Sequence, residues 1–253
     1  MSLGPTATMV WIVALALLVL TGCDVMPGRP QPADRPALPS EETAFTALYG
    51  QHCAGCHGAA GGLGAARPLN DPVYLALVPQ ERLRNIIAQG VPGTAMPAFA
   101  AGAGGALTEA QIEALVSDML TRWSRPSTVK ALALPPYDAA QAVADGVSAG
   151  DPERGREVYA RACAGCHGAD GRGGRKGGSV VDAAYLALVS DQALRTAVIA
   201  GRTDLGMPDW RGDIPGQPLT AQQVADVVAW LAAHRVPVAG RSGASVQARR
   251  SRP

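Results

Sequence analysis

The sequence predicts an all-α protein built from two tandem copies of one small helical domain. Two observations support this fold class. The segment Cys53–Ala59 recurs letter for letter at Cys163–Ala169, and further matching features follow both copies at nearly the same spacing. Each copy also contains segments with the hydrophobic period of helices, whereas no two segments have the alternating pattern of a strand pair.

The N-terminus has the pattern of a bacterial export signal. Residues 10–20 form an uninterrupted apolar run, which is too short to span a bilayer comfortably. The letters LTGC follow, ending at Cys23, and resemble a lipobox, although no Lys or Arg precedes the run. We expect a lipoprotein signal peptide over residues 1–22 and a lipid on Cys23 that anchors the chain. An ordinary cleaved signal peptide is the alternative.

The repeat sets the domain organisation. Three further features recur in the same order and at nearly the same offset along the chain as the first segment. They are the letters YLALV from Tyr74 and Tyr185, the pair Met-Pro at Met96 and Met207, and a helical pattern that opens at Thr108 and Thr220. The expected organisation is a Pro-rich linker over residues 23–40, a domain over 41–125, a linker over 126–147, a domain over 148–237 and a basic tail over 238–253.

Helices are expected around these repeated features. The ranges are 81–89, 111–123, 192–200 and 220–234, and a further helical pattern precedes Cys53 and Cys163. Thr108 followed by Gln111 is a capping-box pattern at the start of a helix. The glycines at positions 90 and 201 suit the ends of the two shorter helices.

Each repeated segment contains the pattern Cys-x-x-Cys-His. The residues are Cys53, Cys56 and His57 in the first copy, and Cys163, Cys166 and His167 in the second. This is the attachment pattern of c-type haem, in which two thiols add to the vinyl groups and the histidine reaches the iron. A zinc site more naturally uses four ligands, and a thioredoxin-like dithiol needs a βαβ context. The pattern therefore favours two covalently bound haems c.

Both copies resemble class I cytochrome c domains, and the resemblance covers nearly all of the chain between its linkers and tail. It implies that a methionine supplies the sixth iron ligand from a loop between the middle and last helices. Met96 follows His57, and Met207 follows His167, at spacings that differ by a single position; each methionine precedes a proline. We therefore expect His57 and Met96 on one iron, and His167 and Met207 on the other.

The resemblance also implies two supporting contacts. Pro68 would offer its carbonyl to the ring N–H of His57, whereas the second copy has Gly177-Gly178-Ser179 there. Gly155 and Tyr159 would pack near Trp230, where the first and last helices meet. Of the remaining candidates, Met119 is expected in the core, and His52 and His234 are expected to be exposed to solvent.

Iron with His and Met ligands has no open position, which favours electron transfer over substrate binding. We expect a dihaem electron carrier, or the cytochrome subunit of a membrane respiratory complex, on the periplasmic side of the bacterial inner membrane. It would be an electron-transfer protein with redox-protein partners and no small-molecule substrate. The alternative is a dihaem redox enzyme, either peroxidase-like or thiosulfate-oxidising.

The composition agrees with this interpretation. A net charge of +1 argues against a nucleic-acid-binding protein. Two Phe, four Trp and five Tyr in 253 residues predict a thin core, which a porphyrin in each domain would fill. Four of the five cysteines are assigned to haem and the fifth to the lipid. Arg172, Arg175 and Lys176 form a basic loop after the second haem motif, where they could attract an acidic partner.

Overall fold

The computed structural model describes residues 38–129, 132–212 and 217–236. These residues are helical, and the described part of the chain contains isolated β-bridges but no strand. The described residues from Glu42 onward form one compact unit, and the short helix η2 (Pro39–Glu41) belongs to a separate one. The expected signal peptide, Cys23 and the basic tail lie outside the described residues.

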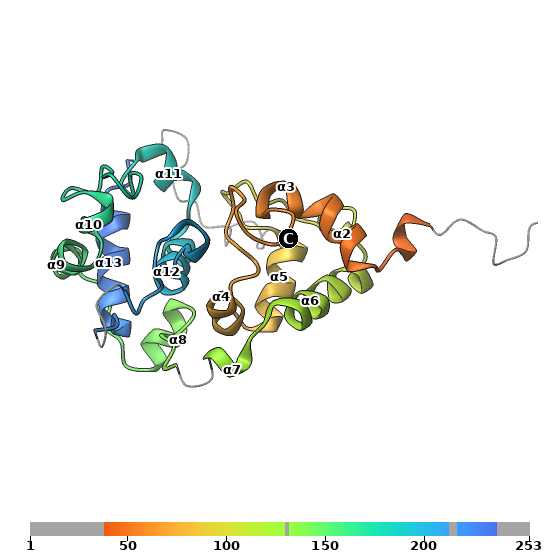
Figure 1. The fold of residues 1–253 in the computed structure, drawn as a ribbon, viewed down its shortest axis with the longest axis horizontal. Coiled ribbons are helices and arrows are strands. Elements are labelled where there is room, and N and C mark those ends of the chain that lie inside the picture. Colours follow the sequence, from red (N-terminus) through yellow and green to blue (C-terminus); the bar gives the residue numbers. More distant parts are fainter. Residues whose placement is uncertain (1–37, 130–131, 213–216, 237–253) are drawn as a thin grey trace, which may run out of the picture. The chain divides into compact units, whose positions relative to one another are not determined.

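The helices of the first half, residues 42–125, follow the expected order (Figure 1). They are α2 (Phe45–His52), α3 (Ala54–His57), α4 (Pro72–Leu77), α5 (Gln80–Gln89), the short η3 (Ala101–Ala103) and α6 (Glu109–Trp123). The expected helices over 81–89 and 111–123 are confirmed as α5 and α6. The helix α4, which contains the YLAL letters of the repeat, was not predicted as a helix.

The second half, residues 148–236, repeats this order. Its helices are α9 (Pro152–Ala162), α10 (Ala164–His167), α11 (Ala183–Leu188), α12 (Asp191–Ala200), the short η4 (Thr203–Leu205) and α13 (Ala221–Ala233). The expected helices over 192–200 and 220–234 are confirmed as α12 and α13. Two all-helical halves of matching order agree with the predicted fold class.

The two long helices begin with the same cap. The Thr108 hydroxyl accepts the N–H of Gln111, and the Gln111 side chain accepts the N–H of Thr108. Thr220 and Gln223 repeat this reciprocal pair at the start of α13. Each capping box satisfies two backbone N–H groups that have no partner inside the helix, so it fixes where the helix starts.

The first and last long helices of each half, α2 with α6 and α9 with α13, lie against each other (Figure 1) and pack through aromatic residues. In the second half, Tyr159 of α9 stacks on Trp230 of α13 with ring centroids 4.2 Å apart. A Cβ atom on Gly155 would lie 2.1 Å from the backbone oxygen of Asp226, so only glycine permits this close approach. This confirms the predicted contact. Phe45 and Trp123 meet edge to face in the first half, with centroids 5.4 Å apart.

The predicted linker contains two short helices that were not expected, α7 (Pro126–Val129) and α8 (Ala139–Ala144). Its backbone is held by the second half, because Arg195 donates two hydrogen bonds to the carbonyl of Pro136 at 2.9 and 3.0 Å. Gln192 donates to the carbonyl of Tyr137 at 2.9 Å. This part of the linker is therefore packed against α12.

The apolar core of the second half is small. One of its buried clusters consists of Val158, Tyr159, Leu186, Leu194, Val227, Trp230 and Leu231. For this cluster the prediction of a thin core holds, whereas the cluster centred on the first half is larger and also includes Ile199, Ala200, Trp210 and Val224 of the second half. Among the described residues, no helix has both the length and the apolar character needed to cross a membrane.

The contact at Gly155 gives a first testable prediction. Replacing Gly155 with Ala should destabilise the second half by about 1–3 kcal/mol, because the new methyl group would collide with the backbone of α13. Gly50 of α2 is the matched control: a Cβ there meets no atom within 4 Å, so Gly50→Ala should be neutral or slightly stabilising. Urea unfolding followed by circular dichroism measures both, and equal midpoints would contradict the close approach.

Candidate haem-binding sites

One helical turn carries both cysteines and the histidine in each half. In the first half, the N–H groups of Cys56 and His57 both donate to the carbonyl of Cys53, at 3.2 and 3.0 Å. In the second half, Cys166 and His167 donate to Cys163 at 3.1 and 3.0 Å. The two thiols and the imidazole are thereby held on one turn, α3 or α10, directly after the first long helix.

A tyrosine fixes the end of this turn. The Tyr49 hydroxyl donates to the carbonyl of Gly58 at 2.8 Å, and the Tyr159 hydroxyl donates to that of Gly168 at 2.6 Å. Burial raises the pKa of both phenols to about 12, so each stays a neutral donor. Since each tyrosine also packs against the last helix, the haem-motif turn is tied to the helix crossing.

A backbone carbonyl orients each histidine. The Nδ1 atom of His57 lies 2.7 Å from the carbonyl oxygen of Arg67, and that of His167 lies 2.8 Å from the carbonyl of Gly178. A carbonyl oxygen can only accept, so Nδ1 carries the hydrogen and Nε2 keeps its lone pair. This is the tautomer that a metal-ligating histidine needs. The residues present therefore fit an iron ligand in both halves.

The prediction that Pro68 supplies this carbonyl is wrong by one residue, because Arg67 supplies it. Pro68 is the next residue after the carbonyl that accepts the hydrogen bond from His57. In the second copy, where the proline is missing, the carbonyl of Gly178 takes the same role. The pKa of His57 is lowered by burial and by the charges of Arg202 and Arg67, against the opposing hydrogen bond to Arg67. A lowered pKa favours the neutral imidazole that binds metal.

The first cysteine of each motif lacks the electrostatics of a reactive thiol. Burial raises the pKa of Cys53 to about 11, and burial together with the charge of Cys166 raises that of Cys163 to about 11. Thiols that work in redox exchange have lowered pKa values, because the thiolate is the nucleophile. The thioredoxin-like alternative is therefore disfavoured by these surroundings as well as by the helical fold.

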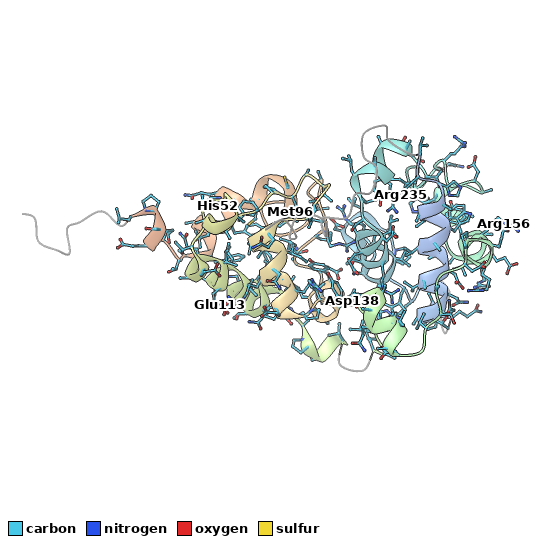
Figure 2. All side chains as sticks on the ribbon, turned by 180° about the vertical axis from the view of Figure 1, so that it is seen from behind. His52, Met96, Glu113, Asp138, Arg156 and Arg235 are labelled. Atoms are coloured by element: carbon cyan, nitrogen blue, oxygen red, sulfur yellow. The ribbon has the colours of Figure 1, made fainter. Side chains whose placement is uncertain are left out.

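The two methionine loops return to the ends of α5 and α12 in the same way. The N–H of Val91 donates to the carbonyl of Met96 at 3.1 Å, and that of Arg202 donates to the carbonyl of Met207 at 3.1 Å. Figure 2 labels Met96 in the first half. Both loops thus begin with a backbone contact between the helix end and the methionine.

A glycine at each helix end allows this return. Gly90 and Gly201 have φ angles of 68° and 71°, as their expected role at a helix end requires. A Cβ atom on either residue would lie 2.7 Å from the carbonyl oxygen of Met96 or Met207. Any other residue at these two positions would push the methionine loop away from its helix.

The other methionine and histidines considered from the sequence, Met119, His52 and His234, differ in how far they are buried. Met119 is 2 % exposed, which confirms it as a core residue. The prediction that His52 and His234 are exposed is wrong, since both are half-buried. The His52 ring lies edge-on to Phe99 with centroids 5.9 Å apart (His52 is labelled in Figure 2). His234 donates from Nδ1 to the carbonyl of Trp230 at 2.8 Å and packs against its indole.

Sequence reasoning missed two arginines beside the first site, Arg67 and Arg202, which both lower the pKa of His57. A single arginine belongs to no sequence motif that would have indicated its role. The comparison of the two copies carried a signal, however, because Arg202 replaces Val91 in the Met loop and Arg67 stands where the second copy has Gly178. Differences inside an otherwise repeated pattern mark where the two halves do different things.

Comparison with known proteins assigns the family. The family model described as cytochrome c oxidase, cbb3-type, subunit III matches residues 40–117 and 150–231, once in each half. The chain is 28 % identical over 180 residues to the cbb3-type cytochrome c oxidase subunit FixP of Sinorhizobium medicae. The aligned region covers 66 % of this chain and 53 % of FixP. The chain therefore spans about half the length of that relative.

Two further similarities are more limited. The dihydro-heme d1 dehydrogenase of Pseudomonas aeruginosa is 42 % identical over 76 residues, which cover 30 % of this chain and 14 % of the dehydrogenase. A chain of the reducing HAO-like protein complex of Kuenenia stuttgartiensis is similar in structure, with a TM-score of 0.42 and 18 % identity over 79 % of this chain and all of that one.

The two-fold family match coincides with the two haem-motif turns described above. The chain belongs to the family of the cbb3-type cytochrome c oxidase subunit III, and its two halves are class I cytochrome c domains that together bind two covalent haems c.

Proposed function

We propose that this chain carries electrons one at a time in a bacterial respiratory chain, without transforming a substrate of its own. Cys53 and Cys56 hold one haem and Cys163 and Cys166 the other, with His57 and Met96 on one iron and His167 and Met207 on the second. Haem supplies an iron that takes up and releases one electron. The protein's task is to keep both axial positions filled while the charge of the iron changes.

The observation that carries the proposal is the equivalence of the two sites. Each histidine donates from Nδ1 to a carbonyl at 2.7 or 2.8 Å, and each Met loop is fastened to a helix end through a glycine. An enzyme such as a dihaem peroxidase needs one iron with a position open to its substrate. Two alike sites favour two closed irons, and methionine favours a higher reduction potential than a second histidine.

The relatives support a respiratory setting. FixP is named as a subunit of a cbb3-type cytochrome c oxidase. We propose that this chain likewise delivers electrons towards a terminal oxidase or reductase, either as a carrier or as a fixed subunit. A lipid on Cys23 would hold it on the periplasmic face of the inner membrane, and two or three acyl chains suffice for stable anchoring.

The basic loop after the second haem motif is a docking surface in this proposal. Arg172, Arg175 and Lys176 are exposed, and Gly177 next to them donates its N–H to the carbonyl of Cys166 at 3.1 Å. The loop therefore lies against the turn that holds the second haem. Asp170 offsets one charge by its contact with Arg172 at 3.3 Å, which leaves a net positive surface for an acidic partner.

The methionine assignment gives the test of the proposed function. Oxidised wild-type protein should show the methionine–iron charge-transfer band at the strength of two haems. Met96→His should halve the band, keep the iron low-spin and lower the reduction potential of the first haem, because histidine is the stronger donor. Met119→Leu is the control: this core residue should leave band and potentials unchanged.

Three results would contradict the proposed function. A band of one-haem strength in the wild type would leave one iron without methionine. A Met96→His protein that keeps the full band would mean that another methionine is the iron ligand. A substantial high-spin signal in electron paramagnetic resonance, with turnover of peroxide, would favour the dihaem enzyme.

The docking surface gives a separate prediction, with the anionic oxidant ferricyanide as the probe. Oxidation of the second haem should slow as salt is added, and Arg175→Glu should lower its rate at low salt by at least about threefold. Arg156→Glu is matched in charge change and also exposed, but lies on α9 (labelled in Figure 2), so it should have a smaller effect. Equal effects of the two variants, or a flat salt dependence, would count against the loop.

A further inference from the structure

A group of hydrogen bonds joins the first half to the second beside the haem-motif turn of the first. We call this contact the clasp; it consists of Leu63, Gly64, Arg67 and Asp71 from the first half and Gly201, Arg202, Thr203 and Asp204 from the second. The clasp is thus made by the loop after the first Cys-x-x-Cys-His motif and by the start of the second Met loop.

Asp71 anchors one side of the clasp. Its Oδ1 atom accepts the N–H of Tyr74 at 2.8 Å and so caps α4, while Oδ2 accepts the hydroxyl of Thr203 at 2.7 Å. The residue is 6 % exposed. Hydrogen bonds to a charged and buried acceptor are among the stronger ones in proteins, so this contact holds the two loops at fixed distance.

Arg202 and Asp204 form the other side. Arg202 donates to both carboxylate oxygens of Asp204, at 2.9 and 3.0 Å, and also to the carbonyl of Gly64 at 3.0 Å. Asp204 in turn accepts the N–H of Leu63 at 3.0 Å. The pKa of Asp204 is held below its ordinary value, first by the hydrogen bonds from Arg202, so the carboxylate stays charged. Each member of the ion pair therefore makes a hydrogen bond to the backbone of the first half, Arg202 to Gly64 and Asp204 to Leu63.

Apolar packing lies beneath these polar contacts. The helices α4 and α12 are in contact, and Ile199 and Ala200 at the end of α12 belong to the same buried cluster as Tyr74 and Leu75 of α4. Polar contacts over an apolar base resist relative motion of the two halves better than either alone, because separation would expose the apolar area and remove the hydrogen bond from Thr203 to Oδ2 of Asp71.

The clasp connects the two candidate haem sites directly. On the first side, His57 donates to the carbonyl of Arg67 and Ala66 donates to the carbonyl of Cys56, at 2.7 and 2.9 Å. On the second side, the backbones of Arg202 and Met207 exchange two hydrogen bonds, at 3.0 and 3.1 Å. A continuous series of covalent and hydrogen bonds therefore runs from the first histidine to the second methionine.

We propose that the clasp is a fixed electron-transfer contact between the two haems, with Arg202, Thr203, Asp204 and Asp71 as its positioning residues. With haem bound at both turns, His57 and Met207 would face this contact, and one electron would pass from the ferrous to the ferric haem, with no proton or further reactant. This inference rests on the proposed function, since it requires two redox-active haems.

The contact is asymmetric: it joins the haem-motif loop of the first half to the Met loop of the second half. Val91 occupies the position of Arg202 in the first Met loop, so that loop has no guanidinium with which to repeat the contact. In the second half, the loop equivalent to residues 63–67 is the basic loop proposed above as a docking surface. The first Met loop and the second haem-motif loop are thus the two ends at which outside partners would exchange electrons.

The test compares two variants of the full-length, haem-loaded protein. Thr203→Val with Asp204→Asn removes clasp contacts, whereas Asp209→Asn weakens the similar pair of Asp209 and Arg211 (2.6 Å), which lies within the second half. The rate of electron equilibration between the haems after a rapid one-electron pulse should fall about tenfold or more in the clasp variant, since each lost charge-assisted hydrogen bond lowers the joined population by about that factor. Small-angle X-ray scattering should show a larger radius of gyration.

Asp71→Ser checks the clasp from the first half. Serine still caps α4 but no longer offers Thr203 a charged acceptor, so the rate should fall here too, far from the second Met loop in sequence. The control Asp209→Asn should leave the rate and the radius unchanged. In all variants, two haems and a full methionine charge-transfer band show that the sites themselves are intact, which separates this test from that of the proposed function.

An unchanged rate in both clasp variants would overturn the proposal, as would a rate that stays fast while the radius of gyration grows. An equal loss in Asp209→Asn would also overturn it, because the effect would then come from the second Met loop alone.

Discussion

The hydrogen bond from the histidine of each Cys-x-x-Cys-His turn to a backbone carbonyl is the constraint around which each half of this protein is arranged. It requires the loop after Cys-x-x-Cys-His to return to the imidazole, which brings the carbonyl of Arg67 to His57 and that of Gly178 to His167. The returning loop then leads into α4 or α11. The tyrosine of the preceding helix closes the same loop, so site and helix crossing form one structure.

Duplication kept this arrangement and changed its surroundings. The haem-motif turns, tyrosines and glycine-ended helices are alike in the two halves, whereas the loops beside them differ. The first haem-motif loop is uncharged from Ala59 to Ala66 and contacts Arg202 and Asp204; its counterpart in the second half is basic and exposed. One loop thus joins the halves and the other is available to a partner, which suits a chain that passes electrons in sequence.

The sequence predicted the features that are encoded locally. The capping box at Thr108 and the glycine ends of α5 and α12 were predicted because cap residues and hydrophobic period stand next to each other, whereas the equivalent box at Thr220 was not predicted. The helix α4 was missed because so short a segment shows no period, although Asp71 caps it. The carbonyl of Arg67 was missed by one residue, since any residue type provides a carbonyl. The clasp depends on residues that lie far apart in the chain, which a single sequence does not pair.

We propose that each haem is the core of its own half as well as its redox centre. Replacing Cys163 and Cys166, the proposed attachment residues of the second haem, with Ala measures this directly. Residues 148–236 should then lose helical circular dichroism and become sensitive to protease, because their own apolar cluster is small, while the first haem keeps its spectrum. A second half that stays folded and protease-resistant without its haem would show that the haem is not its core.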